Sequence, residues 1–227
     1  AFALDAADWT GGLDALAPVS VVAVILGFLL ARSRHSEFFA LILSSLYSAG
    51  AVLGINALFL TDGGSLAARL HAVATEFAIW IDQSLAGRQP ENDDTAFVIF
   101  LSILFWFLGH NAAWHVFRVD RVWRVIIPTG LVLITNQFYY QGDASLDGYL
   151  IAFVILSLLL LIRSHIDARE FEWYLHRVSF PNYVRRTFFQ AGAVLAIVIV
   201  LAAWVVPAGQ DDKSLDRIED LMSGDAF

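Results

Sequence analysis

The sequence predicts an all-α integral membrane protein: a polytopic bundle of about six transmembrane helices with one amphipathic helix at the membrane interface. Three observations predict this fold class. Of 227 residues, 58% are hydrophobic and only 16% are charged, whereas soluble domains carry about 25% charged residues. The mean hydropathy is +0.65. The hydrophobic residues form long runs, and every Asp, Glu, Lys and Arg falls between these runs.

The spans follow from the length needed to cross a bilayer, about 20 helical residues for roughly 30 Å of hydrocarbon. The first predicted span stops at Arg32, and Pro18 lies in its first turn, where a missing N–H costs nothing. The fifth is expected to continue beyond the membrane as a basic and aromatic stem. The predicted spans are residues 16–31, 38–60, 95–117, 125–140, 149–162 and 188–206.

Small residues mark the second span as an interior helix. Because small side chains let a neighbouring backbone approach closely, we expect this helix to be packed on several sides. The residues concerned are Ser44, Ser45, Ser48, Gly50 and Gly54.

The fourth span is the weakest prediction, because it is short and carries Pro128, Gly130, Asn136 and Gln137. A kinked or re-entrant segment is the alternative. A re-entrant segment would move the five arginines that follow the fifth span to the outer side. We therefore favour a helix that spans.

Orientation follows from the basic residues, which accumulate in cytoplasmic loops. With segments 32–37, 118–124 and 163–186 inside, the inner segments hold ten basic and five acidic residues. The remaining segments hold four basic and seventeen acidic residues. Both ends of the chain are therefore expected outside the cytoplasm of a bacterial inner membrane.

Residues 63–86 are predicted to form the amphipathic helix, with Ser65 as its N-cap. A 3.6-residue apolar stripe is opposed by Arg69, Glu76 and Asp82, which is typical of a helix lying on a bilayer surface. Packing of the stripe on another protein layer is the alternative. The stripe comprises Leu66, Leu70, Val73, Phe77, Trp80, Ile81 and Leu85.

The residues that carry chemistry are few. The chain has no cysteine, which excludes disulfides, thiolate metal clusters and cysteine nucleophiles. Charged groups within spans mark many transporters and pumps, and their lack here disfavours a carrier. His110 is a weak candidate ligand for a tetrapyrrole, although a hydrogen bond to a neighbouring helix is the more common role of such a histidine. His110 and His115 are turned by about 140° on an ideal helix, so they should not share a face or a metal.

Polar amides within or beside the spans, Asn111, Asn136 and Gln137, are interpreted as hydrogen bonds between helices. The sequence therefore predicts no catalytic residue, no bound metal and no cofactor. The net charge of −8 disfavours nucleic acid as a partner. The expected partners are the lipid bilayer and other membrane protein subunits.

Four segments carry a resemblance to a known family. Their landmarks are Trp114 followed by a basic turn, the NxxYY of residues 136–140 and the terminal Pro207. They resemble the N-terminal membrane region of bacterial transglutaminase-like membrane proteins, in which a helical bundle precedes an extracytoplasmic transglutaminase-fold domain. The segments are LGFLLARSR (26–34), residues 107–140, LLLLIRSHIDAREFEWYLHRV (158–178) and FFQAGAVLAIVIVLAAWVVPAG (188–209).

The resemblance implies a membrane domain over residues 1–209, with a cytoplasmic stem at 163–186. Residues 210–227 would form an extracytoplasmic linker to a further domain. The family's catalytic Cys, His and Asp belong to that domain, so none is carried over to this segment, and only the full-length protein would be a transglutaminase-like or protease-like enzyme. Residue 1 is Ala rather than Met, so we also expect sequence upstream.

The leading functional hypothesis is a non-catalytic membrane platform that orients an extracytoplasmic domain. The alternative is an accessory or scaffold subunit of a large bacterial membrane complex, respiratory or photosynthetic. Its aromatic surfaces would contact partner helices, lipid or pigment. A carrier of small molecules is the third hypothesis.

Overall fold

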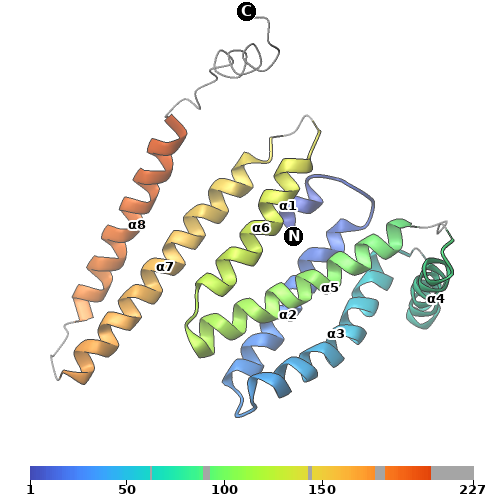
Figure 1. The fold of residues 1–227 in the computed structure, drawn as a ribbon, viewed down its shortest axis with the longest axis horizontal. Helices are drawn as coiled ribbons and strands as arrows, with labels where there is room; N and C mark the ends of the chain where they lie inside the picture. The colour runs from blue at the N-terminus through green and yellow to red at the C-terminus, as the bar shows by residue number, and fades with distance from the viewer. Residues whose placement is uncertain (62, 89–92, 143–144, 177–181, 206–227) are drawn as a thin grey trace, which may run out of the picture. The chain divides into compact units, whose positions relative to one another are not determined.

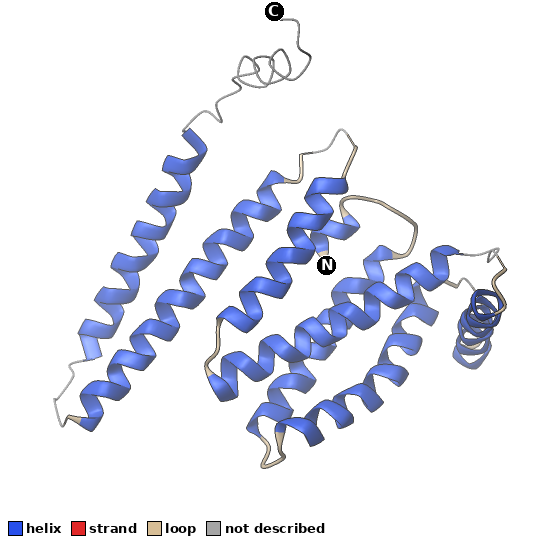
Figure 2. Cartoon of the chain, in the orientation of Figure 1, coloured by secondary structure: helices blue, strands red, loops and turns tan. Residues whose placement is uncertain are grey.

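The computed structural model describes residues 1–61, 63–88, 93–142, 145–176 and 182–205, and the regular structure in these ranges is helical (Figure 2). The chain divides into two compact units, residues 1–153 and 154–227. The elements are α1 (Phe2–Asp5), the 3-10 turn η1 (Leu13–Ala15), α2 (Leu16–Arg32), α3 (Glu37–Phe59), α4 (Leu66–Leu85), α5 (Asp93–Trp114), the π-helical turn η2 (His115–Val119), α6 (Trp123–Tyr139), α7 (Asp147–Leu175) and α8 (Asn182–Val205).

Each predicted span coincides with a helix. Five helical stretches are long and apolar enough to cross a membrane: 13–32, 37–59, 94–119, 147–175 and 183–202. The helix α6 has 17 residues and runs through Pro128 without a break in assignment. Its crossing of the membrane therefore stays a prediction.

The closest helix packing in the first unit is between α2 and α5, which cross in Figure 1. It depends on small residues on both helices. A Cβ atom at Gly27 of α2 would lie 2.9 Å from Ala113 Cβ, and one at Gly109 of α5 would lie 2.9 Å from Ala23 Cβ. The two backbones therefore approach as closely as small side chains permit.

Helix α3 packs on α5 through a polar stripe. The indole Nε1 of Trp106 donates to the carbonyl oxygen and to the hydroxyl of Ser44, both at 3.1 Å. One turn earlier along α5, Ser102 Oγ accepts a hydrogen bond from Asn56 Nδ2 of α3 at 3.0 Å. Burial of Ser44 and Ser48 agrees with the expected close packing.

The expectation that α3 is an interior helix is wrong for its glycines. A Cβ atom added at Gly50 or Gly54 would meet nothing within 4 Å. The physical reason is that α3 contacts its neighbours on the serine face, and the glycines lie away from it. In this chain the glycine-mediated approach occurs between α2 and α5 instead.

The amphipathic helix α4 begins as predicted, with the Ser65 side chain accepting a hydrogen bond from the Ala68 N–H. Val73 is fully buried, and Leu70 and Phe77 pack beside it on the core formed with α2, α3 and α5. Leu66 and Leu85, at the two ends of the stripe, stay exposed. The middle of the stripe therefore contacts the chain's own helices, and contact of α4 with a bilayer surface stays a prediction.

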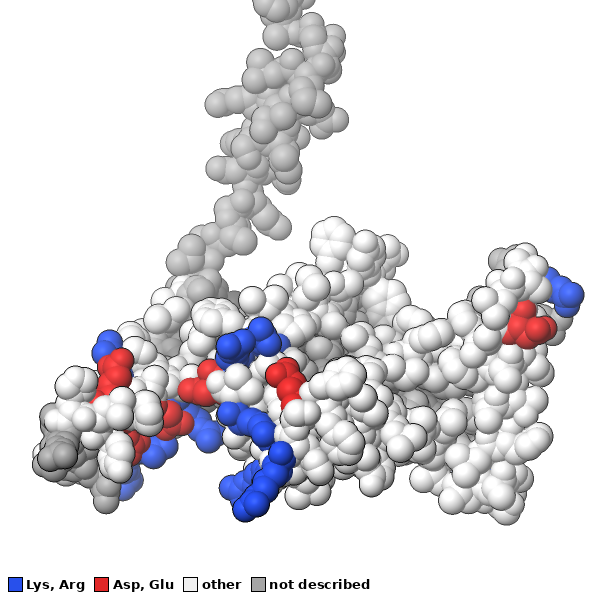
Figure 3. Space-filling view, turned by 60° about the horizontal axis from the view of Figure 1, so that its bottom comes forward, with Lys and Arg blue, Asp and Glu red and all other residues white. Residues whose placement is uncertain are grey.

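Two arginine-bearing connections lie at one end of the first unit. The Arg118 guanidinium donates to the carbonyl oxygens of Ala31, at 3.3 Å, and Ser33, at 2.7 Å. These bonds join the end of η2 to the turn between α2 and α3. Figure 3, in which the lower end of Figure 1 comes forward, shows Lys and Arg side chains with Asp and Glu side chains among them.

Asn136, near the end of α6, holds the N-terminal segment. Its Oδ1 accepts a hydrogen bond from Trp9 Nε1 at 2.8 Å, and its Nδ2 donates to the Ala3 carbonyl oxygen at 3.1 Å. Asn136 is buried. The amide predicted to join helices thus joins α6 to the segment that precedes α2.

We expect Asn136→Leu to release this segment, because both hydrogen bonds are lost and a membrane offers their partners little replacement. Amide hydrogen exchange of residues 2–9 should accelerate about five- to thirtyfold, the factor that corresponds to a local cost of about 1–2 kcal/mol. Asn111→Leu, which removes an amide of α5 that bonds to Arg124 and not to the N-terminal segment, is the control. Unchanged exchange in Asn136→Leu would show that the apolar contacts of α1 suffice.

In the second unit, α7 continues as one helix to Leu175, as the predicted stem requires, and ion pairs join it to α8. Arg185 contacts Asp167 at 2.8 Å and Glu170 at 3.2 Å. A Cβ atom at Gly192 would lie 2.9 Å from Ile162, so the two helices also pack closely. Helix α8 starts at Asn182, ahead of the predicted span 188–206, and Arg185 in its first turns forms these ion pairs. The predicted linker 210–227 lies outside the described residues.

Candidate functional site

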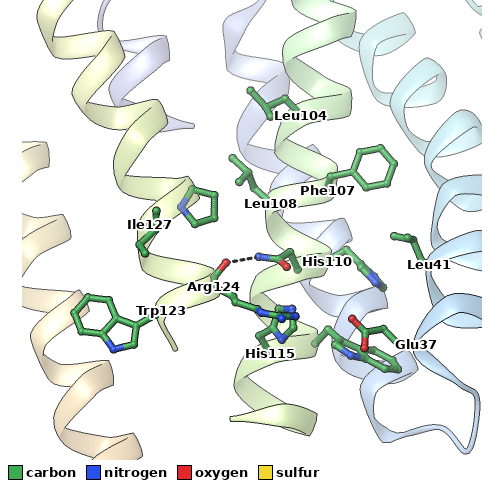
Figure 4. A pocket seen from close by; sticks show the side chains of 13 residues that line it. Glu37, Leu41, Leu104, Phe107, Leu108, His110, His115, Trp123, Arg124 and Ile127 are labelled. Atoms are coloured by element: carbon green, nitrogen blue, oxygen red, sulfur yellow. Dashed lines mark hydrogen bonds between the residues drawn. The ribbon is translucent and has the colours of Figure 1, made fainter. Parts of the chain in front are cut away.

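A pocket of about 730 Å³ extends across α5, between α3 on one side and α6 on the other (Figure 4). Helix α3 contributes its first turns, α5 and η2 the central wall, and α6 its first half. The lining residues are Glu37, Leu41, Leu104, Phe107, Leu108, His110, Asn111, Trp114, His115, Trp123, Arg124, Ile127 and Pro128.

The pocket has a polar and an apolar end. In Figure 4, Glu37, His115 and Arg124 lie together at the end near the connections, whereas Leu104 lies at the opposite end. The polar end is the end of the first unit that carries the arginine turns. An amphiphilic molecule would match this division, with its polar group at the level of the turns.

Three buried side chains of the pocket wall lack a hydrogen-bond partner within the described part of the chain. They are His110, His115 and Trp114, which are 5%, 4% and 3% exposed. The unpaired atoms are Nδ1 of each histidine and Nε1 of the tryptophan. A buried unpaired polar atom costs about 1–3 kcal/mol, so a hydrogen-bond partner that reached any of these three atoms would stabilise the protein.

The pocket reaches both histidines, although their spacing predicts that they do not share a face. Figure 4 shows His110 on the side of Glu37 and His115 near Arg124. The pocket contacts both because it extends around α5 from α3 to α6. His110, the weak cofactor candidate, also stacks on Trp114 with ring centroids 6.1 Å apart. Within the described ranges, no three His, Asp or Glu side chains are grouped closely enough to hold a metal ion.

Asn111 sets the position of α6 relative to α5. Its Nδ2 donates to the Arg124 carbonyl oxygen at 2.7 Å, the bond drawn as a dashed line in Figure 4. Gln137 likewise donates to Asp147 at 2.7 Å. Both amides therefore act between elements, as interpreted from the sequence.

Sequence reasoning missed Glu37 and Arg124 as site residues, because both were counted only as loop charges. The signal available was their position immediately before two predicted spans, in the first turns of α3 and α6. Their charges act on His115 from two elements. The pocket is therefore lined by one acidic and one basic side chain, from different helices.

A second, mostly apolar pocket of about 490 Å³ lies between α5, α6 and the N-terminal segment. It shares Leu104 with the first pocket. Thr135 and Tyr139 contribute hydroxyl groups to its lining, and two other polar residues of the lining, Trp9 and Asn136, bond to each other. The space along α5 and α6 thus continues as an apolar path away from the polar end.

Comparison with known proteins gives no match to a protein family, a curated protein or a solved structure.

Proposed function

We propose that the chain is a non-catalytic, multi-pass membrane domain that anchors and orients an extracytoplasmic domain in a bacterial inner membrane. The observation that carries the proposal is the placement of the basic turns. Arg118 bonds to the turn after α2, so two of the three arginine-rich segments lie at the same end of the first unit. Such segregation of basic residues supports a single cytoplasmic side.

The surface of the helices supports insertion in a bilayer. Large apolar side chains are exposed along several helices, an arrangement that soluble proteins avoid because such patches associate. Lipid would cover these side chains. Examples are Val21, Ile25 and Leu29 of α2 and Val194, Leu195, Val198 and Leu201 of α8.

The orienting role requires α6 to span, because six crossings would place both ends of the helical region on the outer side. The resemblance to transglutaminase-like membrane proteins supports an extracytoplasmic domain of that fold. Recovery of the full-length reading frame tests this part. A stop codon soon after Phe227, without downstream Cys, His and Asp, would remove the enzyme link.

Topology is testable cleanly, because the chain has no native cysteine. We expect Ala86→Cys, after α4, to react with an impermeant maleimide from outside intact spheroplasts. Ser33→Cys and Ala168→Cys should react at least about tenfold faster after permeabilisation, since the bilayer shields their side. Labelling of Ala168→Cys from outside would overturn the orientation and the platform role together.

An accessory subunit is the second candidate, favoured by the open glycine face of α3. A groove of about 330 Å³ is lined there by Leu46, Tyr47, Gly50 and Trp106, among others. Small residues beside such a groove would admit a partner helix. Purification in mild detergent distinguishes the accessory subunit from the platform domain. A protein that elutes without partner proteins and without colour argues against a subunit that binds partners or pigment.

A further inference from the structure

We propose that the pocket across α5 binds one zwitterionic phospholipid with a primary ammonium headgroup, its phosphate on Arg124 and its ammonium on Glu37. The proposal requires only that the first unit lies in a bilayer. It is independent of the platform role.

The two charges of the pocket are available for a ligand. No ion pair to Glu37 or Arg124 occurs among the described residues, whose ion pairs lie on α7 and α8. The two groups line one pocket from α3 and α6, on opposite sides of α5. Both side chains are exposed, so a ligand at the membrane surface can reach each of them, and a ligand with only one sign of charge would form a charge-assisted contact with only one. A zwitterion compensates both.

Two buried neutral side chains that also line the pocket can bond to a phosphate. The indole Nε1–H of Trp114 is a donor only, and it has no partner in the described chain. A phosphate supplies several acceptor oxygens, and the planar guanidinium of Arg124 can bond to two of them at once. His115 Nδ1, also unpaired, can donate in one tautomer.

Glu37 selects between ammonium groups. A primary ammonium has three N–H donors for a carboxylate, whereas a quaternary ammonium has none. The carboxylate lies in the first turn of α3, at the level of the basic turns, where a lipid headgroup would lie. Phosphatidylethanolamine therefore fits the polar end better than phosphatidylcholine or phosphatidylglycerol.

The apolar residues of the pocket wall would contact the acyl chains of the lipid. Leu104, Leu108 and Ile127 continue from the polar end towards the second pocket, which begins at the shared Leu104. Ile127 and Leu131 of α6 are exposed, so a chain can enter from the surrounding lipid. The site therefore matches a phospholipid, with charged residues for the headgroup at one end and apolar lining for the acyl chains beyond them.

Native mass spectrometry tests the proposal. The 227-residue chain in detergent is equilibrated with equimolar palmitoyl-oleoyl phosphatidylethanolamine, phosphatidylglycerol and phosphatidylcholine. We expect one phosphatidylethanolamine to be retained about tenfold over either competitor. Arg124→Gln and Glu37→Gln should each reduce its occupancy about tenfold, because each removes one charge-assisted contact.

Two matched variants serve as controls. Arg121→Gln removes an arginine from the same turn that does not line the pocket, and Asp82→Asn removes an exposed acid from α4; both should retain the lipid. Leu104→Trp should lower occupancy with the charges intact, because it fills the apolar path. Unaltered thermal stability of each variant separates lost binding from lost folding.

Three results would overturn the proposal. Equal or preferred retention of phosphatidylglycerol would show that the site binds lipid through its positive charge alone. Equal retention of phosphatidylcholine would show that Glu37 does not accept hydrogen bonds from the ammonium group of the lipid. Loss of lipid in Arg121→Gln equal to that in Arg124→Gln would show diffuse attraction to the basic turns rather than a defined site.

Discussion

Replacing Gly27 or Gly109 with leucine should force α2 away from α5 and destabilise the first unit by about 3 kcal/mol. A Cβ atom at Gly27 would lie 3.0 Å from the Cα atom of His110, and one at Gly109 would lie 3.1 Å from the Ser20 carbonyl oxygen. These neighbours are backbone atoms, which cannot move aside by changing rotamer. The whole helix must shift, and the dispersion contacts along the crossing are lost.

Thermal unfolding in detergent, followed by the loss of a monodisperse elution peak, measures this effect. Gly50→Leu is the matched control, because a Cβ atom at Gly50 of α3 meets nothing within 4 Å. It should unfold within a few degrees of the unmodified chain. Equal stability of the Gly27 and Gly50 variants would mean that the α2–α5 crossing adapts to larger side chains.

The helices were predictable because a bilayer leaves the backbone few choices. Within hydrocarbon, each N–H and C=O must be bonded inside the chain, so long uncharged runs become helices. The first span, predicted at 16–31, is α2 at Leu16–Arg32. The cap at Ser65 was also predictable, because the N-cap bond is local in sequence.

The lateral arrangement of the helices was not predictable from one sequence. Gly27 and Gly50 both lie in uncharged stretches of apolar helices, yet only Gly27 is at a tight crossing. Nothing in their local sequence distinguishes them, because the difference depends on which helix lies opposite. The same holds for the pocket. Glu37 and Arg124 are 87 positions apart, and only the placement of α3 and α6 beside α5 brings them to one site.

Trp106→Ala should be the most destabilising single truncation in the core, at about 4 kcal/mol. Trp106 is 1% exposed, the largest side chain among the fully buried ones, and packs with Val19, Val52 and Ile99. Its loss removes packing from the core cluster shared by α2, α3, α4 and α5 and leaves a cavity. Trp123→Ala, at a residue that is 60% exposed, is the control and should cost less than about 1 kcal/mol.

A second substitution of Trp106 distinguishes the contribution of packing to stability from that of hydrogen bonding. Trp106→Phe keeps most of the ring but removes the donor to Ser44, and hydrogen bonds between membrane helices contribute about 0.6–1.7 kcal/mol. Van der Waals packing is expected to dominate, so Trp106→Phe should cost less than half as much as Trp106→Ala. A double-mutant cycle with Ser44→Ala, read by unfolding in mixed detergent micelles, isolates the side-chain bond. If the phenylalanine and alanine variants were equally unstable, the indole N–H rather than ring volume would hold α3 against α5.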